Sequence, residues 1–166
     1  WALMLGKYLA ALFYTGVAVA VQLLAFKMVF QTAGGGTLAF ANVLTVGVVL
    51  GVFALTLPLM MVAVGVQFIV ATVTRSFKEA QTYLGLLPLV PAIPGMVMVF
   101  APVQAKAWMM TIPAFSQTLL LGQFVHGETL AATDVLMSTA SSTAAAVLLI
   151  VLAARLYESE KLIFGS

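Results

Sequence analysis

Two long uncharged stretches on either side of one short charged segment constrain this chain more than any other feature. Residues 28–74 contain no Asp, Glu, Lys or Arg, and neither do residues 80–105. Between them, the charged island Arg75–Tyr83 carries two cations and one carboxylate near its start. Apolar stretches of this length aggregate in water, whereas a bilayer accommodates them as spanning helices. We therefore expect the island to lie at a membrane surface, between two spanning helices.

The composition predicts an integral membrane protein with an all-α fold. Hydrophobic residues make up 63% of the 166 residues and charged residues only 7%, against about 25% charged in soluble domains. A soluble domain of this size would still have to cover itself with polar surface. The chain contains no cysteine, which excludes disulfides and thiolate metal sites. Its seven basic residues are scattered along the chain, so no nucleic-acid partner is expected.

Four segments are long enough to cross the hydrocarbon core as helices, which takes about 20 apolar residues. We predict spans at about 7–30, 42–74, 82–100 and 134–157, within one transmembrane domain that covers residues 1–166. Pro58 lies in the middle of the second span and predicts a kink. Three prolines between residues 88 and 94 prevent the third span from being a straight helix. Thr133 or Asp134 is expected to cap the start of the last span.

The segment 108–124 is short and is split by Pro113, so it either crosses the membrane or dips in and returns. A re-entrant path places five cations on one side, namely Lys7, Arg75, Lys78, Arg155 and Lys161, and leaves Lys27 and Lys106 on the other. A crossing path reverses this asymmetry. The positive-inside rule favours the first arrangement. We predict a re-entrant helical pair, with the island and the C-terminus in the cytoplasm.

Within the island, Arg75 and Glu79 are four residues apart and can pair on one helical face. One interpretation is a coupling elbow, formed by Arg75, Lys78 and Glu79, that touches a partner and transmits movement. The alternative is a solvated turn that anchors two helices by charge. Local chemistry alone favours the anchor, because exposed ion pairs contribute little.

Small residues recur at four-residue spacing in the last predicted span. Ser138, Ser142 and Ala146 share one helical face, and a Gly-x-x-x-Gly pattern joins Gly47 to Gly51 in the second span. Such faces let neighbouring helices approach closely, and we favour packing for both. The alternative for the serines is a hydroxyl-lined ion path, since hard cations prefer oxygen ligands.

Three amides lie in or near the apolar segments: Gln22, Gln67 and Gln117. A polar group in hydrocarbon costs free energy unless it is paired. Hydrogen bonding between helices is the favoured interpretation for all three. The alternative is that they line a substrate route together with Ser138 and Ser142.

No pattern in the sequence indicates catalysis. The run Gly34–Thr37 lacks the Lys of a phosphate-binding loop, so we do not expect this chain to hydrolyse ATP. His126, Glu128 and Asp134 lie close together in sequence, but without a second His an exposed turn is favoured over a metal site. We therefore expect no catalytic residue, no metal site and no cofactor in this chain.

Three stretches carry a resemblance to a known family: Leu5–Ala10, Thr74–Leu84 and Arg155–Gly165. In them the chain resembles the membrane subunits of type-2 ABC transporters, most closely the NatB-like branch associated with sodium efflux. The first stretch resembles the Gly-Lys that opens the family's third span. The second is similar to the elbow between the fourth and fifth spans, and the third resembles the C-terminal tail.

The resemblance implies the C-terminal membrane portion of a larger permease subunit, in which two spans, a soluble insertion and a coupling helix come earlier. It implies a second permease subunit, identical or related, and separate ATPase subunits that bind ATP and magnesium. The expected function is an ATP-driven exporter of sodium or another small substrate in the cytoplasmic (inner) membrane. The alternative is a membrane scaffold that anchors other subunits without transporting anything.

Overall fold

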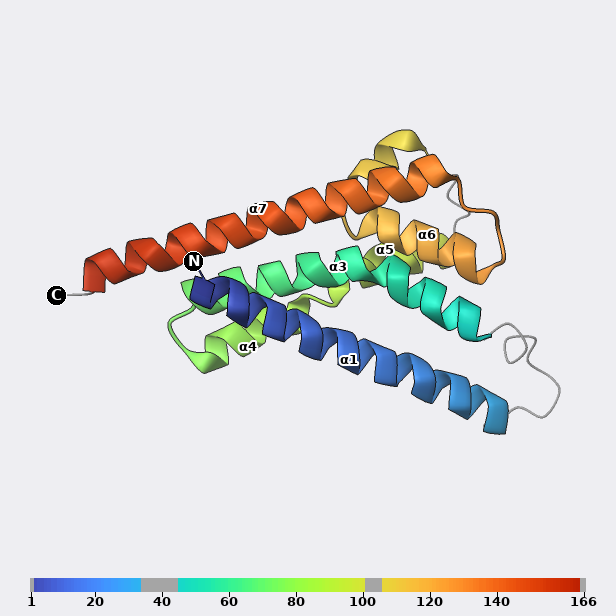
Figure 1. Ribbon diagram of the computed structural model, residues 1–166, viewed down its shortest axis with the longest axis horizontal. Coiled ribbons are helices and arrows are strands. Elements are labelled where there is room, and N and C mark those ends of the chain that lie inside the picture. The colour runs from blue at the N-terminus through green and yellow to red at the C-terminus, as the bar shows by residue number, and fades with distance from the viewer. Residues whose placement is uncertain (1, 34–44, 101–105, 165–166) are drawn as a thin grey trace.

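The computed structural model describes residues 2–33, 45–100 and 106–164, and within these residues every regular element is a helix (Figure 1). In chain order the elements are α1 (Ala2–Ala33), α3 (Val46–Val73), α4 (Phe77–Leu86), α5 (Leu89–Phe100), the 3-10 helix η1 (Ala107–Thr111), α6 (Phe115–Val125) and α7 (Ala132–Phe164). The predicted all-α fold is confirmed.

Four helical segments are long and apolar enough to cross a membrane. They run over Leu3–Val29, Val46–Val73, Phe77–Val97 and Ala132–Tyr157. The first helix begins at Ala2, so Lys7 lies inside it rather than at its start. The second begins after Thr45, whose side chain accepts a hydrogen bond from the Val48 backbone N–H at 3.3 Å; the predicted start at 42 lies outside the described residues.

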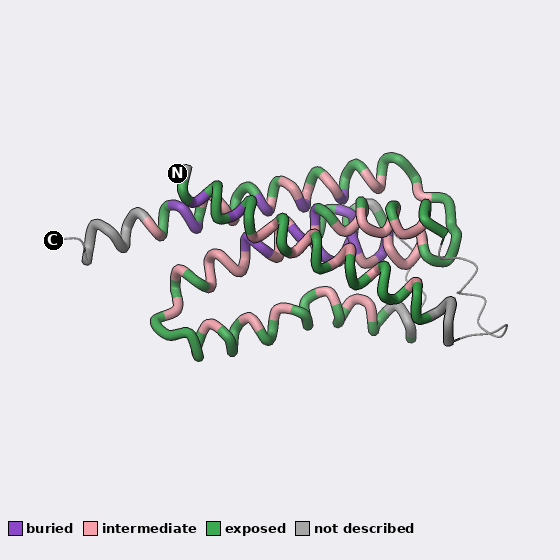
Figure 2. The backbone as a smooth tube through the Cα atoms, turned by 60° about the horizontal axis from the view of Figure 1, so that its bottom comes forward, coloured by how far each residue is buried: buried purple, intermediate pink, exposed green. Residues whose placement is uncertain are grey.

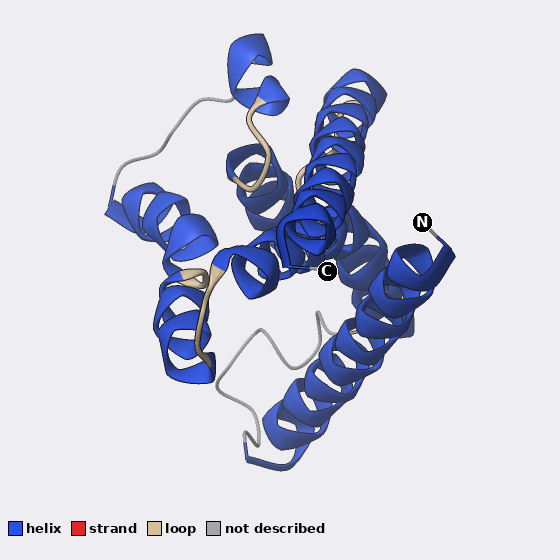
Figure 3. Cartoon of the chain, turned by 90° about the vertical axis from the view of Figure 1, so that its left-hand side faces the viewer, coloured by secondary structure: helices blue, strands red, loops and turns tan. Residues whose placement is uncertain are grey.

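The helices α3 and α7 form the centre of the bundle and pack extensively against each other. Gly65 makes this approach possible, because a Cβ there would lie 3.0 Å from the Cβ of Leu149. Buried residues concentrate where α3, α6 and α7 meet, whereas α4 has none (Figure 2). Seen along the bundle, α1 and the α4–α5 pair lie on opposite sides of this centre (Figure 3).

The helix α1 is held to α3 near the end of the bundle where the charged island lies. The Tyr8 hydroxyl donates a hydrogen bond of 2.8 Å to the backbone carbonyl of Met61, and the Tyr8 ring meets Phe68 edge-on. Further along, the predicted kink site Pro58 is buried within a continuous α3, whose axis bends (Figure 1). Proline removes one backbone donor from the helix without ending it here.

The third span starts earlier than the predicted residue 82, because the island itself caps it. The Ser76 side chain accepts a hydrogen bond from the Glu79 backbone N–H at 3.2 Å and starts α4 at Phe77. Glu79 Oε2 accepts from the Arg75 backbone N–H, also at 3.2 Å. The two hydrogen bonds resemble a capping box, except that the Glu79 side chain bonds the residue before the N-cap. Glu79 therefore bonds the backbone of Arg75. Because Arg75 precedes α4, the two residues do not lie on one face of a helix.

The same span is broken where the prolines begin. The helix α4 ends at Leu86, and α5 starts at Leu89 after a turn that contains Pro88. Pro94 lies inside α5. The expectation that this span cannot be one straight helix agrees with the break between α4 and α5.

The elements η1 and α6 form a pair that enters and leaves at the same end of the bundle, where α5 ends and α7 begins (Figure 1). The reversal occurs at Ala114, whose φ of 68° and ψ of −48° are rare for a residue with a side chain. The Phe115 N–H donates to the Pro113 carbonyl at 2.9 Å, which closes a γ-turn of the strained form. The described pair has the shape predicted for a re-entrant segment.

The start of α7 differs from the prediction. The helix begins at Ala132, so neither Thr133 nor Asp134 is its N-cap. Asp134 lies in the first turn instead, where a carboxylate interacts favourably with the positive end of the helix dipole.

The re-entrant path can be tested by labelling, because the chain has no cysteine of its own. Single cysteines at Ser76 and Gly127, which are both exposed, are expected to react with a membrane-impermeant maleimide from opposite sides of a vesicle. Labelling with and without permeabilisation separates the two sides. Reaction of both positions from one side would contradict the re-entrant path.

Candidate functional site

A group of buried polar side chains lies between the helix α6 of the re-entrant pair and the long helix α7. We call Ser116, Gln117, Ser138 and Ser142 the polar cluster; none of them is more than 1% exposed. The first two lie at the start of α6, directly after the γ-turn, and the last two lie one turn apart on α7. The cluster is therefore built at the tip of the re-entrant pair.

Two members of the polar cluster connect the helices directly. The Ser138 hydroxyl donates to Ser116 Oγ at 2.7 Å. Beside them, the Ser141 hydroxyl lies 3.3 Å from the backbone carbonyl of Met110 in η1 and 3.0 Å from that of Ser138. Serine hydroxyls thus fasten both arms of the re-entrant pair to α7.

The other two members, Gln117 and Ser142, have side chains without a hydrogen-bond partner among the described residues. Neither amide atom of Gln117 forms a hydrogen bond with the described residues, and the Ser142 hydroxyl forms none there either. A buried polar group without a partner costs about 1–3 kcal/mol, and native proteins contain few such groups. Gln117 and Ser142 thus place hydrogen-bond donors and acceptors inside the apolar bundle that no described residue pairs with.

The serine face of α7 also packs, as expected. Ser138, Ser142 and Ala146 are all fully buried. The Ala146 carbonyl would lie 3.8 Å from a Cβ at Gly65, so α3 covers this part of the face. Nearer the start of α7, the same face packs against the re-entrant pair, and its contact there is polar, between Ser138 and Ser116.

A groove of about 450 Å³ reaches the same tip at Ala114, which is one of its lining residues. Ala114 and Gln67 both line it, together with residues of α1, α4 and α5. Two hydroxyls in its wall are occupied, because Thr15 donates to Ala11 and Thr56 donates to Val52 within their own helices. Half-buried Gln67 supplies the one amide side chain among the residues that line the groove.

The structure separates the five residues that the sequence suggested for a substrate route. Gln117, Ser138 and Ser142 belong to the polar cluster, and Gln67 lines the groove that ends at Ala114. Gln22 lies exposed on α1 and joins neither. Sequence reasoning missed Ser116, the partner of Ser138; its only signal was its place beside Gln117 in the re-entrant segment.

The three residues of the coupling elbow, Arg75, Lys78 and Glu79, are all exposed. Their order comes from the capping interactions at Ser76 rather than from an ion pair between side chains. The elbow is thus a defined surface feature at the end of the bundle opposite the re-entrant pair (Figure 1).

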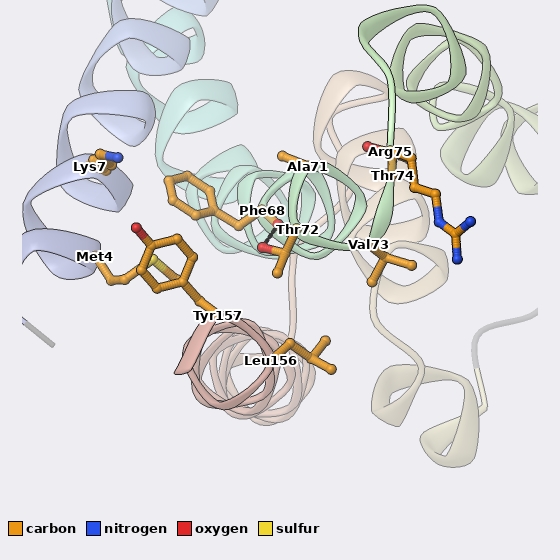
Figure 4. A pocket seen from close by; sticks show the side chains of 10 residues that line it. All are labelled: Met4, Lys7, Phe68, Ala71, Thr72, Val73, Thr74, Arg75, Leu156 and Tyr157. Carbon is orange, nitrogen blue, oxygen red and sulfur yellow. Dashed lines mark hydrogen bonds between the residues drawn. The ribbon is translucent and has the colours of Figure 1, made fainter. Parts of the chain in front are cut away.

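A second cavity, of about 1130 Å³, opens beside the elbow. Its walls come from α1, α3 and α7, and two cations, Lys7 and Arg75, line it (Figure 4). The sequence analysis placed both cations on the same side of the membrane but did not bring them to one site. That they line one cavity depends on how α1 packs against α3.

The described residues contain no group of three or more His, Asp or Glu side chains that could hold a metal. His126 is exposed, and its ring Nδ1 lies 2.7 Å from the Gly122 carbonyl of its own helix. What the described side chains offer a substrate in the polar cluster is therefore neutral hydroxyl and amide chemistry.

No protein-family model, curated protein or solved structure matches this chain.

Proposed function

We propose that this chain is a membrane permease subunit of an ATP-driven exporter. With a partner permease it forms the substrate route, and separate ABC ATPase subunits, which carry ATP and magnesium, supply the energy. The chain itself performs no covalent chemistry. The resemblance of the elbow Thr74–Leu84 and of the flanking Gly-Lys to NatB-like permeases motivates this proposal.

The observation that carries the proposal is the pair of unpartnered groups in the polar cluster. Polar side chains at membrane depth are expensive and by default mark a pathway or a binding site. Gln117 and Ser142 are oriented into protein, not lipid, and have no protein partner in the described chain. A scaffold gains nothing from such groups, whereas a transporter uses them when the substrate passes.

The neutral oxygens of the cluster suit sodium or another small polar substrate better than a large hydrophobic one. Hard cations are bound by hydroxyl and carbonyl oxygens. The groove that joins Gln67 to Ala114 gives the substrate an approach along α3. Rocking of the spans would open and close this approach, and the strained turn at Ala114 is its natural hinge.

The charge distribution orients the proposed subunit. The elbow and the last turns of α7 lie at one end of the bundle, and the re-entrant pair lies at the other (Figure 1). Basic residues are more frequent at the elbow end, which the positive-inside rule assigns to the cytoplasm. The elbow then faces the ATPase subunits in the cytoplasm of a cell whose inner membrane holds the complex.

The test is flux through the complete complex. Permease and ATPase subunits are reconstituted in sealed vesicles, and ATP-dependent movement of sodium and of larger candidate cargo is followed alongside ATP hydrolysis. We expect ATP to drive movement of at least one cargo, and vesicles with a Walker-lysine variant of the ATPase to show none. ATP turnover without movement of any cargo would support the scaffold instead.

A further inference from the structure

The cavity beside the elbow combines two features that a purely structural gap does not need. Lys7 of α1 and Arg75 of the elbow stand at opposite margins, and apolar side chains of α3 and α7 lie between them (Figure 4). The cavity is partly open and lies where α1 begins, α3 ends and α7 reaches its last turns. In the predicted topology this is a membrane surface, so the charge and the apolar walls of the cavity both face the boundary between headgroups and acyl chains.

The two cations have no counter-ion in the described chain. Glu79 is the nearest carboxylate in sequence, but its Oε2 accepts from the backbone N–H of Arg75, and no ion pair joins it to the guanidinium. No described carboxylate pairs with Lys7 either. Two positive charges at the rim of one cavity attract an anion, and no described side chain of the protein supplies one.

The remaining polar groups of α3 at this cavity do not compete for that anion. The Thr72 hydroxyl donates to the Phe68 carbonyl and the Thr74 hydroxyl to the Val70 carbonyl, both at 2.8 Å. Their protons are committed to their own helix. Recognition of an anion therefore rests first on Lys7 and Arg75, and Tyr157 adds a polar side chain from α7 to the lining, while Met4, Phe68 and Leu156 offer apolar contact.

We propose that this cavity binds an anionic phospholipid with two phosphates, of the cardiolipin type. The two cations stand on opposite sides, so one phosphate near each matches the charges better than a single phosphate between them (Figure 4). The acyl chains lie along the apolar walls of α3 and α7. A soluble anion would use the cations but leave these walls exposed to water. Basic pockets between membrane helices are known to select such headgroups.

Bound in this way, the lipid ties together elements that are far apart in sequence. It bridges the start of α1, the end of α3 with the elbow, and the last turns of α7. The site is independent of transport, because it requires neither the polar cluster nor an ATPase. We expect instead that the elbow is more stable in membranes that contain this lipid.

The test measures lipid retained by the purified full chain with native mass spectrometry, after exchange into mixed micelles that contain cardiolipin, phosphatidylglycerol or phosphatidylcholine. We expect cardiolipin to be retained best and phosphatidylcholine least. Lys7→Gln and Arg75→Gln should each weaken cardiolipin retention roughly fivefold, the equivalent of about 1 kcal/mol per basic residue near a membrane surface. Circular dichroism confirms that each variant is folded.

Two matched controls carry the same chemistry outside the cavity. Lys27→Gln removes a lysine from α1, and Arg155→Gln removes an exposed arginine from α7; neither residue lines the cavity. Both should retain cardiolipin as the parent chain does. If they weaken retention as much as Lys7→Gln and Arg75→Gln, general surface charge explains the binding and the site is refuted.

Three further outcomes would overturn the proposal. Equal retention of cardiolipin and phosphatidylglycerol would refute the two-phosphate match. Full displacement by excess inorganic phosphate would make this a site for a soluble anion. Unchanged lipid retention, with loss of subunit assembly in Lys7→Gln and Arg75→Gln, would make the cavity a protein interface.

Discussion

Gln117→Met is expected to make the protein more stable and at the same time to slow transport by roughly tenfold or more. Methionine is unbranched and fills nearly the same space as glutamine, but it brings no amide to be left without a partner. Because neither amide atom of Gln117 has a partner in the described chain, its removal should raise the free energy of unfolding by about 1–3 kcal/mol. The opposite signs of the two effects are what distinguish a functional polar group from a structural one.

Two measurements check this. The unfolding midpoint of the purified chain in detergent gives the stability, and ATP-dependent flux in vesicles gives the function. We expect flux to fall by roughly tenfold or more, which corresponds to at least about 1.4 kcal/mol of lost stabilisation of the rate-limiting state. Gln22→Met is the matched control for transport: Gln22 is exposed on α1, outside the polar cluster, and its replacement should leave the flux unchanged.

The role of Gln117 in the route is refuted if Gln117→Met transports normally. A fall in stability would show instead that the amide contributes hydrogen bonds to the fold. In that case the favoured sequence interpretation, hydrogen bonding between helices, would hold for Gln117.

Gly51→Ala is expected to release the re-entrant helix from α3. A Cβ at Gly51 would overlap Cζ at the tip of the Phe124 ring, so the ring must leave its place. Overpacking of this kind costs about 1–3 kcal/mol. This loss exceeds the roughly 0.5–1 kcal/mol that alanine gains over glycine inside a helix. The unfolding midpoint should therefore fall, and a cysteine at Ser116 should become reactive to a small maleimide.

The Gly-x-x-x-Gly pattern supplies its own control. At Gly47 a Cβ would meet only the Thr45 side chain, at 3.9 Å. Gly47→Ala should therefore be neutral or slightly stabilising. The double variant Gly51→Ala/Phe124→Ala should lose less free energy of unfolding than the two single variants lose in sum. We expect a coupling energy of about 0.5–3 kcal/mol. Strict additivity would show that the ring and the glycine do not meet.

The sequence was sufficient for the membrane-length helices because hydropathy and charge act over whole segments. Long uncharged stretches predict spans, and Pro113 together with the placement of lysines and arginines predicts a re-entrant path. The helix of the third predicted span begins at Phe77, five residues before the predicted start at about residue 82, since Ser76 and Glu79 cap α4 inside the island. The start of α4 is thus set by the local capping hydrogen bonds and not by the boundary between charged and apolar residues.

The candidate site could be predicted only in part. Buried glutamine and serine are conspicuous in an apolar chain, so Gln117, Ser138 and Ser142 were named from sequence. Ser138 and Ser116 are 22 residues apart, and their pairing depends on how α6 and α7 meet. No periodicity within one helix contains that information. The same holds for Lys7 and Arg75, which become neighbours of one cavity only after α1 has packed on α3.

The short re-entrant pair has a consequence for the order in which the protein is inserted. The helix α6 has 11 residues and η1 has five, so α6 extends about 16 Å, against a hydrocarbon core of about 30 Å. Neither can enter the bilayer alone, because the carbonyls freed at the γ-turn and the polar cluster need protein around them. Part of that protein is α7, which follows the pair in the sequence and holds both of its arms through serine hydroxyls. The pair is therefore expected to wait at the membrane surface and to take its final place only after α7 has been inserted.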